Sequence, residues 1–403
     1  MPRPPSPPDP LALPPVPPPA PADHAWRDRI VVTLFALALV LPLVGAIVNR
    51  DVVTTVFEKR RTAPWPEPPA AVTAWRAWPT GFEAAFADRF GGRDLLISLH
   101  HRAKAQGFGI SPVPLAMIGR DGWIYFLGED GKAVDRDYRG IVPYPPDQLT
   151  KSAAEIKRRH DFLAALGIPY VVMIVPDKAT IYPEHLPRWV ARAAPQSRLD
   201  AFYAAMKAHP DVTVLDLRPA LTAGKARERN YYKTDSHWNF LGATIGYEAL
   251  AAVLKAKVPG FPAVPAMRPI YEPGVDVYSG DLANMIGLPK LFREDDLASL
   301  GRVLVDAPKR CAQPVAEPFP PGTPLPKTEI IVYACDRPGL PSAVVFRDSM
   351  TIPLVPLLSE NFRRVVYVSG RHLDRTLVER EKPDVVIEVI VERGMDGPAV
   401  FPM

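Results

Sequence analysis

The stretch at residues 234–239 reads T-D-S-H-W-N and has Asp235 and His237 two positions apart. A hydrolase-type site uses such a pair to prepare a nucleophile. The imidazole takes the nucleophile's proton, and the carboxylate fixes the imidazole tautomer and stabilises the imidazolium. An isolated D-x-H pattern is common by chance, and a single histidine is more often a packed or surface residue than a base. The hypothesis of a catalytic pair therefore requires a nucleophile elsewhere in the chain.

Ser349 is the best candidate for that nucleophile. Residues 344–350 read V-V-F-R-D-S-M, so an apolar, strand-like run stops abruptly at the serine and a helix-like segment follows. A serine at such a turn is exposed at the top of a sheet, near a helix N-terminus that favours negative charge. Arg347 stands where a glycine would ease a strained turn. The sequence therefore offers only the backbone N–H of Ser349 or Met350 as oxyanion donors.

Several motifs resemble, in the same order, those of the SGNH-hydrolase-like polysaccharide O-acetyltransferases, the alginate AlgX and AlgJ group. The T-D-S-H-W-N stretch, followed by Gly242-Ala243, is one of them. The others are F-A-D-R-F-G-G-R-D-L-L-I-S-L-H-H-R from residue 86, D-G-W from 121, P-x-K-x-x-I-Y-P from 176, G-D-L from 280 and E-R from 392. The resemblance covers roughly residues 80–395. It implies that the Asp-His pair precedes the serine, an order permuted relative to ordinary SGNH esterases.

The resemblance also implies substrate contacts around the predicted triad. The predicted substrate-binding residues are Lys178, Tyr182, Trp238, Asn239, Arg347 and Arg393. Lys178 and Tyr182 follow a predicted strand at its carboxyl end, where open parallel sheets bind their ligands. Tyr182 and Trp238 could stack on sugar rings. The alternatives are a loop lysine that is merely solvated, and for Arg393 a simple ion pair.

A triad of Ser349, His237 and Asp235 favours acetyl transfer through an acetyl-serine intermediate. In this hypothesis, a hydroxyl of an exported polysaccharide (alginate-like, cellulose or another exopolysaccharide) replaces water as the second nucleophile. The resemblance implies that a membrane-bound acyltransferase partner supplies the acetyl group. Two other functions stay open. One is a carbohydrate esterase or deacetylase with the same triad, and the other is a non-catalytic polysaccharide-binding scaffold of an envelope assembly.

Composition and missing motifs exclude other classes of partner. The sequence has no H-E-x-x-H pattern and no glycine-rich nucleotide-binding loop, so we expect no metal and no cofactor. The net charge is +4 without a basic block, so we expect no nucleic acid. Hydrophobic residues make up 47% of the 403 residues, which suits a packed core.

The elements that must hold these residues follow an α/β rhythm. Helical patterns at 146–166, 197–208 and 239–254 alternate with strand patterns at 169–175 and 212–217. After a break, the rhythm returns with strands at 343–346, 364–368 and 384–389 and helices at 351–362 and 371–381. All-apolar strands suit a parallel sheet that is covered on both faces. We therefore expect an α/β fold with a mostly parallel sheet over residues 81–403, and the resemblance implies that this fold is an SGNH-like three-layer α/β/α arrangement.

Two regions depart from this rhythm. Residues 81–106 have a helical pattern with a break at Gly91-Gly92, and Asp121-Gly122 predicts a turn before an aromatic strand. Residues 256–340, rich in proline and glycine, predict an irregular excursion over the site. This excursion contains Cys311 and Cys335, which could form a disulfide in an oxidising compartment. The alternative is two unrelated thiols.

The N-terminal part predicts a membrane anchor. Many of the 50 prolines lie in residues 1–29, for which we expect a disordered or polyproline II tail. Ile30 to Val48 is an uncharged apolar run about long enough to span a bilayer, although it contains Pro42, which transmembrane helices tolerate. A buried soluble helix and a signal peptide cleaved near residues 44–46 are the alternatives, and we favour an uncleaved anchor. A proline-rich linker over residues 49–80 follows.

The charges beside this run do not fix its orientation. Arginines at 27 and 29 precede it, and basic residues at 50 and 59–61 follow it. A naive use of the positive-inside rule would leave the large domain in the cytoplasm. Long domains translocate largely regardless of charge, and the resemblance implies an exported domain. We therefore expect a single-pass anchor in the inner (cytoplasmic) membrane with the catalytic domain in the periplasm.

Overall fold

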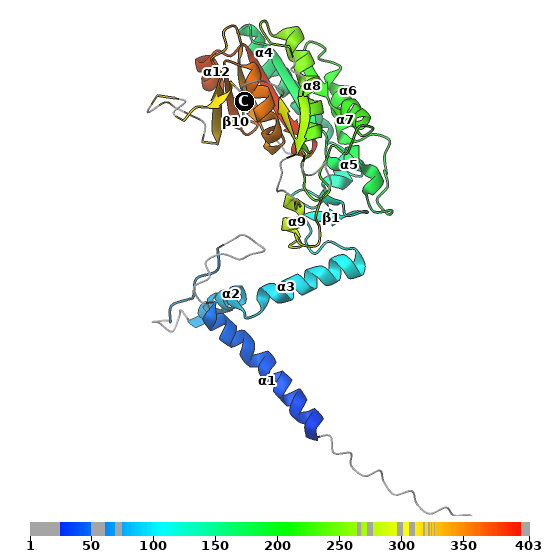
Figure 1. Cartoon of the computed structure of the whole chain (residues 1–403), viewed down its shortest axis with the longest axis vertical. Helices are drawn as coiled ribbons and strands as arrows, with labels where there is room; N and C mark the ends of the chain where they lie inside the picture. Colours follow the sequence, from blue (N-terminus) through cyan, green and yellow to red (C-terminus); the bar gives the residue numbers. More distant parts are fainter. Residues whose placement is uncertain are drawn as a thin grey trace, which may run out of the picture. The chain divides into compact units, whose positions relative to one another are not determined.

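The structure is a computed structural model that describes residues 25–49, 61–68, 75–263, 267–271, 277–295, 301–305, 311–316, 319–320, 323, 325 and 327–395. Most of the predicted tail, and parts of the predicted linker and excursion, lie outside these residues. The chain forms two compact units, Met1–Ile97 and Ser98–Met403. The second unit is built on the predicted α/β fold (Figure 1).

A seven-stranded sheet forms the centre of the second unit, in the order β4-β3-β11-β9-β10-β8-β7. Its strands are β3 (Tyr170–Val175), β4 (Thr213–Asp216), β7 (Gln313–Pro314), β8 (Ile330–Ala334), β9 (Ser342–Arg347), β10 (Arg364–Ser369) and β11 (Val385–Val391). The neighbours from β4 to β10 pair in parallel, whereas β8 and β7 are antiparallel additions at one edge. This mixed, mostly parallel sheet confirms the predicted fold class.

Strand β3 explains why the central strands are apolar throughout. All six of its residues are buried, and successive side chains point to opposite faces of the sheet. Val171, Met173 and Val175 belong to one hydrophobic cluster, while Val172 and Ile174 belong to the other. A strand with a core on each face cannot alternate with polar residues, so the sequence reads as a continuous apolar run.

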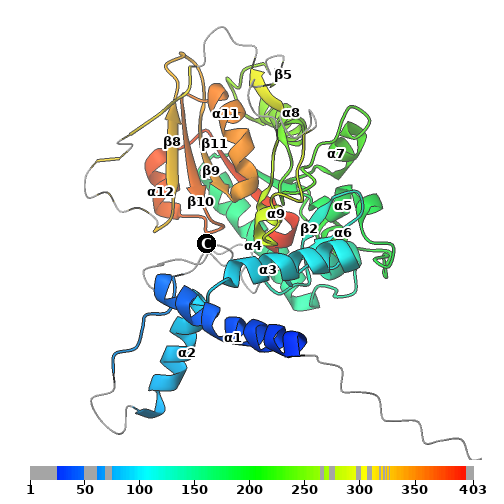
Figure 2. The same cartoon turned by 60° about the horizontal axis from the view of Figure 1, so that its bottom comes forward.

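Helices cover both faces and complete the three layers. On one face lie α4 (Pro146–Ala165), α6 (Arg198–Met206) and α12 (Arg375–Glu381). On the other lie α7 (Arg218–Gly224), α8 (Phe240–Lys257) and α11 (Val355–Leu358). Figure 2 shows α11 and α8 near each other on the same side of the sheet.

The segment after Ser349 differs from the single helix predicted at 351–362. It forms a 3-10 helix η5 (Ser349–Leu354), then α11, then a 3-10 helix η6 (Ser359–Asn361). Proline lacks a backbone N–H and its ring clashes with the preceding turn. Pro353 and Pro356 therefore divide the segment into short pieces.

Shorter elements surround the carboxyl edge of the sheet. They are β1 (Ala116–Ile118), β2 (Ile124–Phe126), η3 (Val134–Tyr138), α5 (Lys178–Ile181), η4 (Pro183–His185), α9 (Asp281–Met285) and η7 (Glu392–Met395). The antiparallel pair of β5 (Met267–Tyr271) and β6 (Gly301–Val305) lies beside α8 instead. The predicted turn between β1 and β2 is present, with positive φ angles at Asp121 (57°) and Gly122 (80°). Cys311 and Cys335 form a disulfide, as expected, within the excursion.

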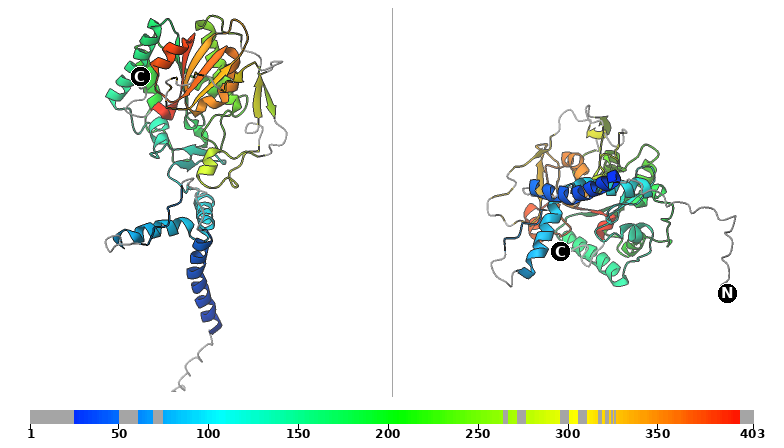
Figure 3. Two further views of the ribbon diagram at one scale, coloured as in Figure 1. Left: turned by 90° about the vertical axis from the view of Figure 1, so that its left-hand side faces the viewer. Right: turned by 90° about the horizontal axis from the view of Figure 1, so that it is seen from below.

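The first unit contains the predicted membrane-spanning segment. Helix α1 (Ala25–Val48) contains Pro42 and is drawn as one blue helix in Figure 3. Its residues Trp26–Val48 are long and apolar enough to cross a membrane. The predicted break at Gly91-Gly92 separates α2 (Trp78–Arg89) from α3 (Arg93–Arg102), which continues as a π-helix, η2 (Ala103–Gly107).

Candidate active site

Ser349 lies at the carboxyl end of β9, where the strand turns into η5. The preceding Asp348 fixes this turn with both carboxylate oxygens: one accepts the Met350 N–H at 2.9 Å and the other the Val391 N–H at 2.7 Å. The second bond joins the end of β9 to the end of its neighbour β11. The Ser349 side chain is left exposed above the sheet, as the sequence predicted.

The loop between α7 and α8 brings Asp235 and His237 to this serine. His237 Nε2 lies 2.8 Å from Ser349 Oγ, and His237 Nδ1 lies 2.7 Å from Asp235 Oδ1. The three predicted side chains therefore form one continuous chain of hydrogen bonds. With Nδ1 bonded to a carboxylate, the tautomer that leaves Nε2 as the acceptor for a serine proton is favoured.

Asp235 has further donors that keep it ionised. Its Oδ2 accepts the Tyr278 hydroxyl at 2.6 Å and the Asp281 N–H at 2.9 Å, and its Oδ1 accepts the His237 N–H at 3.0 Å. Burial by itself raises the pKa of Asp235. The hydrogen bond and charge of His237, with the Tyr278 bond, outweigh burial and hold this pKa well below its ordinary value.

Asp281 is a second carboxylate beside the imidazole. Its Oδ2 accepts the Ser236 hydroxyl at 2.6 Å and lies 3.6 Å from His237 Nδ1, while its Oδ1 accepts the Ser236 N–H at 2.7 Å. Asp281, in the G-D-L motif, and Tyr278 were not among the predicted site residues. The signal that points to both is the neighbouring G-D-L motif. A Cβ on Gly280 would lie 2.5 Å from the Thr234 carbonyl oxygen, so glycine permits this close approach.

Lys178 is not exposed to substrate as predicted. Its side chain is buried, and Nζ donates to the carbonyl oxygens of Tyr232 (3.1 Å), Lys233 (2.9 Å) and Asp235 (2.7 Å). Burial lowers the pKa of Lys178 to about 7, against the opposing charge of Glu294. All three protons of the ammonium group are used inside the protein, which corrects the predicted role as a substrate contact.

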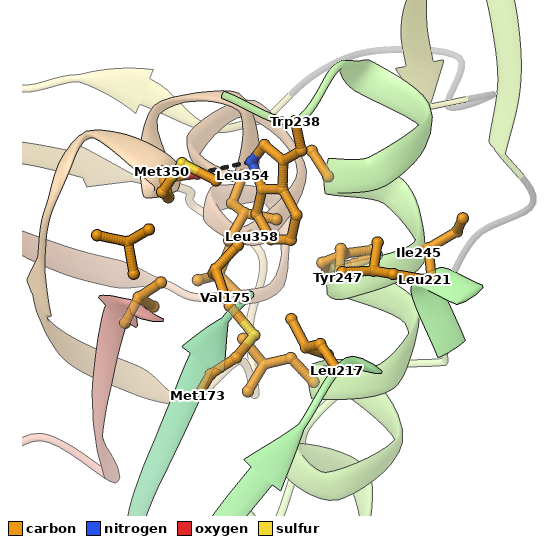
Figure 4. Packing of buried hydrophobic residues seen from close by; sticks show 14 of the residues in the cluster. Met173, Val175, Leu217, Leu221, Trp238, Ile245, Tyr247, Met350, Leu354 and Leu358 are labelled. Carbon is orange, nitrogen blue, oxygen red and sulfur yellow. Dashed lines mark hydrogen bonds between the residues drawn. The ribbon is translucent and has the colours of Figure 1, made fainter. Parts of the chain in front are cut away.

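The aromatic residues predicted to stack on sugars are also buried. Trp238 is 0% exposed and donates Nε1–H to the Met350 carbonyl at 2.9 Å, packing between α8 and the η5 segment (Figure 4). Tyr182 is 4% exposed, and its hydroxyl bonds the backbone and side chain of Asn230 at 2.9 and 3.1 Å. Both predictions were wrong because the rings fill the hydrophobic core instead of facing solvent.

Asn239 and Arg347 likewise have internal partners. Asn239 is the N-cap of α8, where its Oδ1 accepts the Gly242 N–H at 3.0 Å. Arg347 is buried and donates Nη2–H to Glu329 at 2.7 Å. These contacts correct the predicted substrate-binding roles of both residues.

Arg393 remains beside the site. It forms an ion pair with Asp177, in agreement with the alternative reading of this residue. It also lines, with Lys178 and Ser236, a cavity of about 20 Å³ at the carboxyl edge of the sheet. Its predicted contact with substrate stays a prediction.

Two features limit the chemistry of the site. The Met350 N–H already donates to Asp348, whereas Ser349 begins a helix, and a first helical N–H has no intrahelical partner. Ser349 N–H is therefore the better of the two predicted oxyanion donors.

Asp235, His237 and Asp281 offer ligand atoms within 4.8 Å of one another, so a cation there would compete with the hydrogen bonds just described.

Comparison with known proteins adds the family context. The protein family described as SGNH hydrolase-like domain, acetyltransferase AlgX, matches residues 116–309. The probable alginate O-acetylase AlgJ of Pseudomonas aeruginosa is 28% identical over 183 residues, covering 45% of this chain and 43% of the relative. The AlgJ protein of Pseudomonas putida is 29% identical over 185 residues, with 44% of each chain covered. Each alignment therefore spans less than half of the relative.

A solved structure supports the fold independently. PatB1 of Bacillus cereus superposes with a TM-score of 0.50 at 14% identity, covering 69% of this chain and 96% of that one. At this identity the similarity concerns the fold alone. The resemblance predicted from the sequence, to the SGNH-hydrolase-like acetyltransferases of the AlgX and AlgJ group, is therefore confirmed.

Proposed function

We propose that this protein is a polysaccharide O-acetyltransferase that works through an acetyl-serine intermediate. The observation that carries the proposal is the unbroken chain of hydrogen bonds from Asp235 through His237 to the exposed Ser349. The acceptor class comes from the relatives, whose names describe probable alginate O-acetylases. Alginate-like polymers, cellulose and other exopolysaccharides all fit as acceptors.

In the first half-reaction, Ser349 Oγ attacks the carbonyl carbon of the acetyl donor while His237 Nε2 takes the hydroxyl proton. The Ser349 N–H stabilises the negative charge that develops on the carbonyl oxygen. Asp235 stabilises the imidazolium. When the tetrahedral intermediate collapses, the donor's leaving group departs with the proton from His237, and an acetyl ester remains on Ser349.

In the second half-reaction, a sugar hydroxyl enters the same position. His237 takes its proton, and the sugar oxygen attacks the acetyl carbon of the ester. Collapse breaks the bond to Ser349 Oγ, which recovers the proton from His237. The products are an acetylated polysaccharide and the free enzyme, so the acceptor alone decides between a transferase and an esterase.

The apolar helix α1 fits a single-pass anchor. We propose that it holds the catalytic domain at the periplasmic side of the inner membrane, where an exported polysaccharide is accessible. A membrane-bound acyltransferase that passes acetyl groups across the bilayer is the partner we expect. The disulfide between Cys311 and Cys335 supports an oxidising compartment.

The test uses the full-length protein in detergent with 4-nitrophenyl acetate as the acetyl donor. Intact-mass analysis is expected to find one acetyl group on the wild type, and peptide mapping is expected to locate it on Ser349. The Ser349→Ala variant is expected to lose the adduct. Ser111→Ala is the matched control, because the Ser111 hydroxyl bonds the Val113 backbone at 2.8 Å and contributes nothing to the chain of hydrogen bonds.

Acceptors distinguish the remaining functions. With an alginate oligosaccharide or a cello-oligosaccharide present, we expect acetyl groups to move from the adduct to the sugar. An adduct that decays only to acetate, whatever the sugar, would indicate an esterase. No adduct and no ester turnover in the wild type would indicate a polysaccharide-binding scaffold. Turnover that persists in Ser349→Ala would show that another residue is the nucleophile.

A further inference from the structure

The loop that carries Asp235 and His237 has little regular structure of its own. It is closed by an isolated antiparallel bridge between Tyr231 and Trp238 and by a bond from Tyr232 N–H to the His237 carbonyl at 3.3 Å. Buried peptide groups must find partners elsewhere when no ladder satisfies them. The side chains that satisfy this loop therefore determine where the Asp-His pair stands.

Lys178 binds backbone carbonyl oxygens of the loop. It is the first residue of α5, directly after β3, and is 4% exposed. Its Nζ donates to the carbonyls of Tyr232, Lys233 and Asp235. The rings of Trp123 and Tyr125 lie 5.6 and 5.4 Å from Nζ, which favours a cation at this point.

Glu294 binds backbone N–H groups of the same loop. It is 3% exposed and comes from the excursion. Its carboxylate accepts the N–H groups of Lys233 at 2.9 Å and Thr234 at 2.7 Å, and also the Thr234 hydroxyl at 2.5 Å. Arg229 pairs with the same carboxylate. Two opposite charges from distant parts of the sequence thus hold one short loop.

The number of N–H donors on an ammonium group explains why a lysine suits this position. Three carbonyl oxygens converge on Nζ, and an ammonium group has three N–H donors. A neutral side chain of the same length, such as methionine, would leave the Tyr232 and Asp235 carbonyls without this donor, and the Lys233 carbonyl would keep only the Ile124 N–H at 2.9 Å. The loop would then relax, and its Asp-His pair would move relative to Ser349, which belongs to a different element.

We propose that Lys178 and Glu294 are positioning residues that hold the loop of Asp235 and His237 at the correct distance from Ser349. This inference rests on the proposed function, because it assigns the two buried charges to the geometry of the acetyl-transfer site. A misplacement of about 1 Å can reduce a rate by about a hundredfold, so loss of either charge is expected to slow acetylation of Ser349 strongly.

The experiment uses two matched pairs of variants in the full-length protein. Lys178→Met is compared with Lys225→Met, because Lys225 also donates to a carbonyl (Ile181, 2.9 Å) and lies over an aromatic ring (Tyr182, 4.5 Å). Glu294→Gln is compared with Glu388→Gln, because Glu388 is equally buried and pairs with Arg159 on the other face of the sheet.

Two readouts are measured on each variant. Hydrogen–deuterium exchange is followed in peptides that cover residues 232–237, and the rate of Ser349 acetylation by 4-nitrophenyl acetate is measured as kcat and KM. In Lys178→Met and Glu294→Gln, we expect faster exchange of the loop amides and a kcat lower by about tenfold to a hundredfold, with KM little changed. The two control variants are expected to keep both values even if their stability falls.

Restoring the charge gives a further check. Both natural cysteines are in a disulfide, so a cysteine in Lys178→Cys can be alkylated selectively with 2-bromoethylamine in urea without reductant. After refolding, the resulting side chain has an ammonium group at nearly the length of lysine, and kcat is expected to recover at least tenfold over the unmodified variant. Wild type taken through the same steps controls for refolding.

The outcomes separate the two hypotheses. Unchanged loop exchange and kcat in Lys178→Met and Glu294→Gln would overturn the positioning role. Losses of equal size in the control variants would overturn it too. If the wild type forms no acetyl-serine but the loop exchanges faster only in Lys178→Met and Glu294→Gln, the positioning role stands and the proposed function fails.

Discussion

Glu392, the residue directly after β11, is a buried carboxyl group that accepts hydrogen bonds from neutral donors. Its Oε2 accepts the Asp177 N–H at 2.8 Å and the Thr180 hydroxyl at 2.7 Å. The neighbouring Arg393 pairs with Asp177 instead. Burial, and then the charge of Asp177, raise the pKa of Glu392 to about 8. By contrast, Asp235 stays ionised because both of its carboxylate oxygens accept hydrogen bonds.

The Glu392→Gln variant is expected to change the pH dependence of stability. An unfolded glutamate has a pKa near 4.3, so the folded state binds the extra proton between about pH 4.3 and 8. The stabilisation from the protonated group is fully present below about pH 4.3 and is lost as pH rises toward 8. Urea unfolding of wild type should show a loss of up to about 1.4 kcal/mol per pH unit from this group, and Glu392→Gln should lack it.

Glu379→Gln is the control for this measurement, because Glu379 is an exposed residue of α12 and should keep the wild-type slope. Identical slopes in wild type and Glu392→Gln would show that Glu392 is ionised in the folded protein at neutral pH.

At the scale of elements, the residues next to the Asp-His pair join α8 to the η5 segment. Trp238 bonds the Met350 carbonyl at 2.9 Å, and Asn239 begins α8. A Cβ on Gly242 would lie 2.2 Å from the Asn230 carbonyl oxygen and 2.8 Å from the Trp238 Cβ, which explains the glycine in this motif. The T-D-S-H-W-N pattern therefore combines two residues of the proposed chemistry with two that hold the neighbouring elements.

Removing the N-cap of α8 is expected to reduce stability. Asn239→Ala loses the acceptor for the Gly242 N–H, and such a change costs about 1–2 kcal/mol in free energy of unfolding. Asn239→Asp keeps an acceptor and adds a negative charge that a helix N-terminus favours. Urea unfolding should therefore rank wild type and Asn239→Asp above Asn239→Ala. Equal losses in the two variants would mean that the donor bond to the Arg229 carbonyl, at 2.6 Å, matters more than the cap.

At the scale of the whole molecule, the excursion is part of the site. Its residues Tyr278, Asp281 and Glu294 bond the loop of the Asp-His pair. Farther along the chain, the disulfide joins Cys311 to Cys335, which directly follows β8, the neighbour of the edge strand β7. The same disulfide supports the proposed periplasmic location of the domain, because disulfides persist in oxidising environments and are rare in the cytosol.

Export through α1 is expected to determine the state of the cysteines. In bacterial cells that make the full-length chain, Cys311 and Cys335 should not react with a maleimide after denaturation without reductant. A variant that lacks residues 1–48 should stay in the cytoplasm, and both thiols should react. Maleimide-reactive thiols in the full-length protein, with the domain protected from protease added to spheroplasts, would contradict a periplasmic domain.

The sequence by itself determined the local structure and the partners within the predicted triad. Apolar runs, helical spacing and turn residues predicted the parallel strands and most helix bounds, because these patterns depend on neighbours in the chain. The abrupt end of β9 at Ser349, and the D-x-H pair two positions apart, predicted three side chains that the structure brings within hydrogen-bonding distance.

Only the tertiary structure decided which way the surrounding side chains point. Lys178, Tyr182 and Trp238 are of types that bind sugars, but each finds its partners in the core, and burial depends on elements far away in the sequence. Tyr278 and Glu294 reach the site from an irregular segment whose periodicity carries no signal. A loop with unsatisfied peptide groups needs donors and acceptors from other elements, and the fold alone determines which residues supply them.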